Sequence, residues 1–178
     1  MAEAMTDATD VSDVADLLAV ACELIAREGS ALDESRWDDW LAMYERDCEY
    51  WVPTWVEENR LAQDPQSELS HIYYANRHGL EDRLTRVRSG KSPASTPLRR
   101  TTHMTSNVVV QAGSSAQQID ARSSWTCHVF DPSGRGTFML FGRAEYRLVR
   151  REGEWRIARK MTVVNNDYLP AMADFYCI

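Results

Sequence analysis

The sequence predicts an α+β fold in which helices near the N-terminus pack on one face of a curved, mostly antiparallel sheet. Apolar residues recur at helical spacing only in the first half of the chain, whereas strict alternation of two faces dominates the second half. Turn-forming segments separate the alternating stretches, as in a meander of antiparallel strands. Helices followed by strands in a chain of 178 residues indicate one layered domain.

The N-terminal region is expected to contribute two helices. Residues 1–10 are interpreted as a flexible acidic leader, and the single domain is expected to span residues 11–178. A first helix is predicted at 12–27, because apolar residues recur every three or four positions and Gly29 supplies a stop. A second helix is predicted at 33–46, with Asp33 as its N-cap and an apolar face made of Trp37, Trp40, Leu41 and Tyr44.

The middle of the chain is expected to hold short elements. Residues 49–53 are aromatic and end at Pro53, as in an edge strand, and the acidic stretch 56–66 is interpreted as a loop. A strand is predicted at 68–74, and Asn76 is expected to cap a helix that carries Leu80, Leu84 and Val87. The Gly/Pro/Ser-rich stretch 89–98 is a linker too short to divide the chain into domains.

The C-terminal half is expected to form four strands, at 100–111, 119–129, 138–148 and 155–165. Hairpin turns are predicted at the segment DPSGRG and at residues 152–153. In the last strand, Arg159 shares its period with Trp155, Ile157, Met161 and Val163, which predicts that its guanidinium points inside the curved sheet. A buried arginine needs a partner, and Asp38 or Asp39 are the candidates.

The outward face of the strand at 138–148 is polar at one end only, because Thr137, Met139 and Phe141 precede Arg143, Glu145 and Arg147 on it. A sheet face in water is normally polar along its length, so the apolar end is expected to be covered. The apolar tail 168–178 suits docking on a neighbouring subunit. The residues predicted to form subunit contacts are Met139, Phe141, Val164, Tyr168 and Phe175.

Composition and motifs exclude several functions. A net charge of −7 argues against nucleic acid as a partner, and the basic stretch 83–100 is interpreted as a solvated loop. Apolar runs are too short for a membrane span and no signal peptide is recognisable, so a cytoplasmic location is expected. The cysteines at 22, 48, 127 and 177 and the histidines lack the paired spacing of zinc or Rieske sites. No metal, cluster or other cofactor is therefore expected in this chain.

Four segments resemble the small (beta) subunit family of aromatic-ring-hydroxylating dioxygenases. They are WDDWLAMYERDCEYWVPTW, DPQSELSHIYYANRHGLEDRLTRVRSG, RRTTHMTSNVVV and EWRIARKMTVVNNDYLP, within residues 37–170. The order of elements is also similar to the NTF2-like (cystatin-like) cone. The resemblance implies a non-catalytic subunit that holds large (alpha) subunits in place, in a trimer of heterodimers. It implies a Rieske iron–sulfur cluster and a mononuclear iron in those large subunits, and the branch that acts on benzoate-, anthranilate- or salicylate-like acids.

Two other functions stay open at this point. The NTF2-like fold also hosts stand-alone dehydratases and isomerases, and the pocket candidates for such acid–base chemistry are Asp38, His71, Tyr73, His103 and Arg159. A self-associating ligand-binding module without catalysis is the other. Each of these side chains also has a structural interpretation, and the six tryptophans suit core packing or subunit contacts better than a substrate box. No catalytic residue is therefore assigned.

Overall fold

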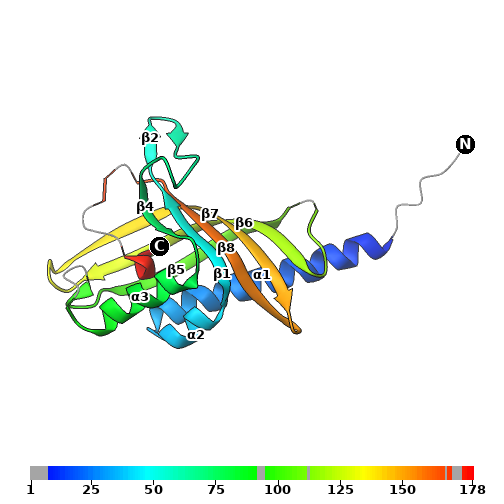
Figure 1. Ribbon diagram of the computed structural model, residues 1–178, viewed down its shortest axis with the longest axis horizontal. Helices are drawn as coiled ribbons and strands as arrows, with labels where there is room; N and C mark the ends of the chain where they lie inside the picture. Colours follow the sequence, from blue (N-terminus) through cyan, green and yellow to red (C-terminus); the bar gives the residue numbers. More distant parts are fainter. Residues whose placement is uncertain (1–7, 92–94, 112, 167, 170–173) are drawn as a thin grey trace, which may run out of the picture.

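In a computed structural model of the chain, helices cover one face of a curved six-stranded sheet (Figure 1). The structure describes residues 8–91, 95–111, 113–166, 168–169 and 174–178. The helices are α1 (Ala8–Asp33), α2 (Trp37–Ala42) and α3 (Arg77–Arg88), with a short 3₁₀ turn, η2 (Phe175–Cys177). The strands are β1 (Tyr44–Pro53), β2 (Trp55–Glu57), β3 (Arg60–Leu61), β4 (Ser70–Tyr74), β5 (Arg100–Val110), β6 (Gln118–Asp131), β7 (Gly136–Arg151) and β8 (Glu154–Val164).

The large sheet has the order β4-β1-β8-β7-β6-β5, and only the β1–β8 pairing is parallel. The predicted α+β fold and its C-terminal meander are confirmed. On β6 the expected inward set is buried, from Ile119 to Val129 at every second residue. Helix α3 also begins as predicted, because the Asn76 side chain accepts a hydrogen bond from the backbone N–H of His78.

The first helix is longer than predicted, and Gly29 does not end it. Gly29 faces β5, where an added Cβ would lie only 3.2 Å from the Cβ of His103. The glycine therefore allows the helix to approach the sheet closely. Of the predicted leader, residues 8–10 belong to α1 and residues 1–7 lie outside the described part of the chain.

The second helix is shorter than predicted, since α2 ends at Ala42 and Tyr44 already begins β1. Asp33 is the last residue of α1 and does not cap α2. The prediction of an edge strand is wrong as well, because β1 lies between β4 and β8. The stretch interpreted as a loop holds the β2–β3 hairpin. Local sequence does not reveal these sheet partners, which come from distant parts of the chain.

An irregularity in β8 reverses the predicted orientation of Arg159. Leu148 on β7 pairs with Ile157, but the preceding Arg147 pairs with Arg159, so one extra residue is inserted in β8. A one-residue shift moves every later side chain to the opposite face. Arg159 consequently lies on the outer face, where its Nε donates to Glu49 at 2.9 Å, and Lys160 points into the cone.

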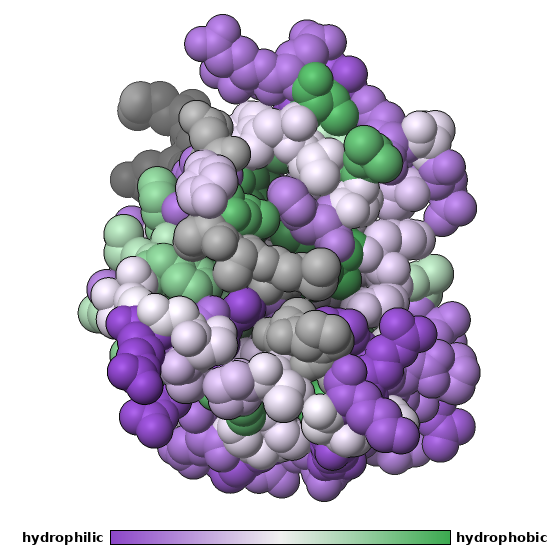
Figure 2. Space-filling model, turned by 90° about the vertical axis from the view of Figure 1, so that its left-hand side faces the viewer, coloured by the Kyte–Doolittle hydropathy of each residue, from purple (hydrophilic) through white to green (hydrophobic). Residues whose placement is uncertain are grey.

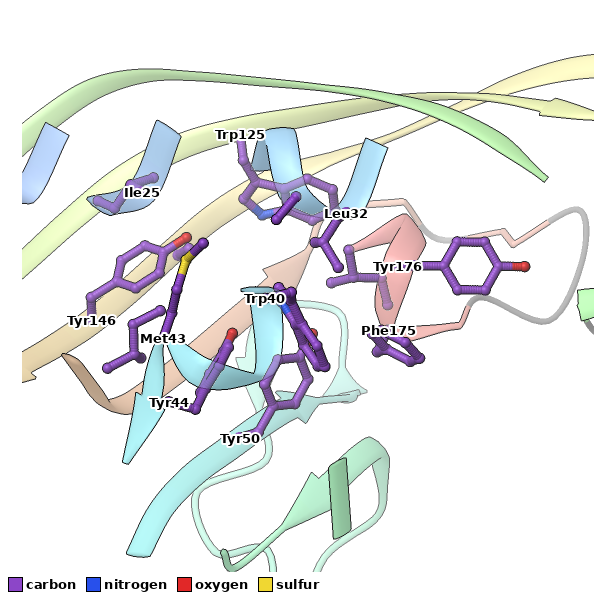
Figure 3. Close-up of a cluster of buried hydrophobic side chains, with 14 of the residues drawn as sticks. Ile25, Leu32, Trp40, Met43, Tyr44, Tyr50, Trp125, Tyr146, Phe175 and Tyr176 are labelled. Carbon is purple, nitrogen blue, oxygen red and sulfur yellow. The ribbon is translucent and has the colours of Figure 1, made fainter. Parts of the chain in front are cut away.

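The end of the predicted tail does not extend from the domain, because residues 175–178 are buried in the core of this chain. Phe175 stacks on Trp40 with ring centroids 4.6 Å apart, and Figure 3 shows aromatic side chains of α2, β1 and η2 converging there. Val164 is buried too. Phe175 and Val164, two of the predicted subunit-contact residues, are therefore part of the interior.

A clasp of ion pairs and hydrogen bonds holds this tail. The buried carboxylate of Asp174 accepts from Arg83 Nε and Nη2, at 2.8 and 2.6 Å, and from Ser95 Oγ at 2.7 Å. Two parallel bonds from one guanidinium fix the geometry of a carboxylate strongly. The clasp thus joins α3, the segment before β5 and the C-terminal turn.

Candidate functional site

The interior of the cone contains a buried ion pair between α1 and β8. Lys160 Nζ donates to Glu28 Oε1 at 2.8 Å, and both side chains are almost fully buried. The hydroxyl of Tyr44 donates to the same carboxylate, and that of Tyr146 donates to it at 3.4 Å. Buried charges of this kind are stable only when paired and hydrogen-bonded, as they are here.

The tyrosines around this ion pair are held in their neutral form. Burial raises the pKa of Tyr44 and of Tyr146 well above the usual value, and the negative charge of Glu28 raises both further. The phenols therefore remain hydrogen-bond donors to Glu28 and do not serve as bases near neutral pH. The cluster links Glu28 of α1 to strands β1, β7 and β8.

A second polar pair links the C-terminal end of α1 to β5. His103 Nδ1 lies 2.6 Å from Asp33 Oδ1, and the backbone N–H of His103 donates to Asp33 Oδ2 at 2.8 Å. Thr101 Oγ1 donates to the same carboxylate at 2.8 Å. Burial opposes ionisation of Asp33, but the hydrogen bonds and charge of His103 outweigh it, so the pKa of Asp33 is lowered.

The structure does not bring the predicted pocket residues together. Asp38 lies on the surface of α2 with its side chain 81% exposed and pairs with Arg88 at 2.8 Å. His71 and Tyr73 lie on the outer face of β4, where Tyr73 pairs with Trp51. Only His103 among the five candidates faces the interior of the cone.

The space inside the cone is small. A cavity of about 20 Å³ lies between α1 and the sheet. Its lining includes both polar pairs and Ile178, in the set Ile25, Glu28, Gly29, Leu32, His103, Thr105, Trp125, Ala144, Tyr146, Lys160, Thr162 and Ile178. This volume suits a water-sized molecule and not a substrate of several heavy atoms.

The described side chains do not form a metal site. No group of three or more His, Cys, Asp and Glu residues within the described ranges is placed to hold a metal ion. The four cysteines are free thiols and three of them are buried. Burial raises the pKa of Cys48 to about 12 and that of Cys177 to about 11, so both thiols are protonated near neutral pH.

The outer face of β5–β7 carries the other candidate site. Met104, Thr126 and Phe141 lie side by side across the three strands, and Thr102, His128 and Met139 form the next row. Met104, Met139 and Phe141 are 57%, 44% and 41% exposed. Figure 2 shows apolar side chains reaching the surface at the end of the molecule that it views. A cluster of exposed large apolar residues is typical of a protein contact.

Solved structures first define the fold class of the protein. A hexachlorocyclohexane dehydrochlorinase from Novosphingobium barchaimii has a TM-score of 0.57 at 15% identity, covering 83% of this chain and 86% of that one. The beta subunit of the benzoate 1,2-dioxygenase from Burkholderia mallei has a TM-score of 0.71 at 28% identity, covering 99% and 100%. The distant match concerns the fold alone, and together they define an NTF2-like cone.

Sequence comparisons then define the family. The chain matches the family described as "Ring hydroxylating beta subunit" over residues 27–171. The anthranilate 1,2-dioxygenase small subunit of Acinetobacter baylyi is 37% identical over 154 residues, 86% of this chain and 93% of that protein. The 2-halobenzoate 1,2-dioxygenase small subunit of Burkholderia cepacia is 38% identical over 152 residues, 85% and 90%. The chain belongs to the family of ring-hydroxylating dioxygenase beta subunits.

The sequence pattern does not predict most of the polar residues that fill the cone. Glu28 carried a usable signal, because it falls at helical spacing on the same side as Ile25 and Leu32, where a carboxylate is unexpected. Lys160 carried none, since its orientation depends on the inserted residue in β8. For Asp33 the sequence predicts only a role as a helix cap.

Proposed function

We propose that the chain is the non-catalytic small subunit in the oxygenase component of a dioxygenase that dihydroxylates an aromatic acid. Its role is structural: it holds large subunits in position. The observation that carries this proposal is the contrast between the two faces of the sheet. Side chains fill the interior of the cone except for a cavity of about 20 Å³, whereas large apolar side chains remain exposed on the outer face.

The benzoate-, anthranilate- or salicylate-like branch is supported by the names of the similar proteins, which are small subunits of an anthranilate 1,2-dioxygenase and a 2-halobenzoate 1,2-dioxygenase. The proposed partners are a large subunit that carries the Rieske cluster and the mononuclear iron, and further copies of this chain in a trimer of heterodimers. None of the helices in the described part of the chain has the length and hydropathy to cross a bilayer. The free, mostly buried thiols suit the reducing cytoplasm, which is the proposed location.

A reconstitution experiment tests the function. The chain alone, given an aromatic acid, a reductant and oxygen, is expected to form no dihydrodiol. Addition of a large subunit is expected to give an assembly and product together, with a mass that corresponds to three copies of each chain. Product formed by the small subunit alone contradicts the proposal, as does a large subunit that never associates with it.

Subunit contacts are proposed at Met139, Phe141 and Tyr168, which the structure leaves at the surface. Phe141→Asp introduces a charge into the apolar part of the outer face, where desolvating a carboxylate opposes association. The monomer is expected to stay folded, because Phe141 lies opposite the buried side of β7. Sedimentation velocity is expected to show loss of the assembly.

Leu69→Asp is the matched control for the outer-face variant. Leu69 is exposed and precedes β4, at the far edge of the sheet from β5. It is expected to assemble as the wild type does. Normal assembly of Phe141→Asp, or equal loss in both variants, places the contact elsewhere.

A further inference from the structure

The ring of His103 presents one nitrogen that the protein itself does not satisfy. Nδ1 is engaged by Asp33, but Nε2 is buried and no described residue lies within hydrogen-bonding distance of it. The side chain is only 9% exposed, so bulk water does not solvate this nitrogen freely. A buried polar atom left unpaired destabilises a protein by about 1–3 kcal/mol, so such atoms are normally paired.

The same small cavity contains a second polar atom of this kind. Thr162 Oγ1 is buried, lines the cavity together with His103, and likewise has no partner among the described residues. The cavity volume of about 20 Å³ exceeds the minimum of about 10–15 Å³ that one water molecule needs. Two polar partners are also enough to hold a water in place.

We propose that the cone contains a binding site for one water molecule, between His103 Nε2 and Thr162 Oγ1. Asp33 Oδ1 lies within hydrogen-bonding distance of Nδ1, which leaves Nε2 to form a hydrogen bond with this water. The Thr162 hydroxyl supplies the second bond. The site is internal and does not depend on the proposed role in subunit assembly.

The surroundings explain why the ligand is no larger than water. Ile25, Leu32 and Trp125 bound the cavity from α1 and β6, and Ile178 bounds it from the C-terminal turn. The Asp174–Arg83 clasp holds that turn in place. A carboxylate that orients an imidazole is an arrangement found in general-base sites. In this chain the cavity beside the imidazole has room for a water molecule but not for a substrate.

A crystal structure of the full chain, at a resolution that shows ordered water, tests the site directly. A water within about 3.2 Å of His103 Nε2 is expected, bonded also to Thr162 Oγ1. A dry cavity, or a water that contacts neither His103 Nε2 nor Thr162 Oγ1, overturns the proposal.

Two variants separate the site from general packing effects. Thr162→Val keeps the shape of the side chain and removes its hydroxyl, so the water is expected to be lost or displaced. Thr126→Val is the matched control, because Thr126 Oγ1 is also buried without a partner among the described residues but lies on the outer face and does not line this cavity. It is expected to leave the water in place. An unchanged water in Thr162→Val, or its loss in Thr126→Val alone, overturns the assignment.

Discussion

At the scale of single residues, the interior is unusual for its charges. Glu28 and Lys160 form an ion pair deep in the cone, and Tyr44 and Tyr146 complete the hydrogen bonding of the carboxylate. Such a pair contributes little net stability over an apolar core, because both ions lose their hydration. Removal of only one partner is strongly destabilising, because the other charge then stays buried without a partner.

Lys160→Met is therefore expected to lower the free energy of unfolding by about 3–5 kcal/mol, measured by urea denaturation. The double variant Glu28→Gln with Lys160→Met is expected to recover part of this loss, because no charge remains buried. Arg147→Met is the matched control. It breaks an ion pair with Asp120 whose side chains are partly exposed, and is expected to lose about 0–1 kcal/mol. Equal losses in the two single variants contradict this account.

Asp33 predicts a pH dependence of stability. Its pKa in the folded chain is lowered, against the effect of burial, by bonds from His103 and Thr101. A lowered pKa adds stability that is complete above the ordinary value of 3.8 and is lost as the pH falls through the folded-state value. The difference in unfolding free energy between wild type and Asp33→Asn is thus expected to shrink from pH 6 to pH 3. A difference that grows as the pH falls contradicts the assignment.

At the scale of elements, close approach of backbones decides several contacts. Gly29 lets α1 reach β5, and Gly142 lies where β7 passes the backbone of β8. The indole of Trp125 donates there to the carbonyl oxygens of Arg143 and Val163, at 3.2 and 3.3 Å. Because Gly29 and Gly142 have no side chain, the helix and the strands can approach one another closely at these two positions.

Gly142→Ala is expected to destabilise the protein severely, by about 3 kcal/mol or more. An added Cβ would lie 2.0 Å from the carbonyl oxygen of Val163, and backbone atoms cannot move away cheaply. Gly136→Ala, on the same strand, is the control, because its Cβ meets only a backbone oxygen at 3.9 Å. Thermal denaturation of both variants tests this. Similar midpoints for the two show that β7 and β8 separate more easily than the structure implies.

At the scale of the whole molecule, the chain is an internally filled cone with an exposed apolar patch. Among its described residues, no three His, Cys, Asp or Glu side chains are arranged to hold one metal ion. Purified alone, the chain is expected to contain no stoichiometric iron or zinc after dialysis against a chelator. Elemental analysis measures this. One equivalent of bound iron per chain contradicts it and requires a site that the geometry does not show.

The sequence by itself determined the layers, the meander and the family resemblance, because these depend on local periodicity and on residues close together in the chain. The alternation on β6 and the Asn76 cap are confirmed in the structure. The exposed position of Phe141 and Met139 also follows from alternation alone. Local patterns of this kind remain valid whatever the partner of each strand is.

Only the tertiary structure decided which side chains meet. The inserted residue in β8 exchanged Arg159 for Lys160 in the interior, and a one-residue shift leaves no trace in a periodic pattern. The apolar tail looks the same in sequence whether it covers a neighbour or its own core, and here Phe175 lies against Trp40. The pairing of Asp33 with His103 joins residues 70 positions apart. Contacts between residues so far apart in sequence form only when the whole chain folds, so a local sequence pattern does not predict them.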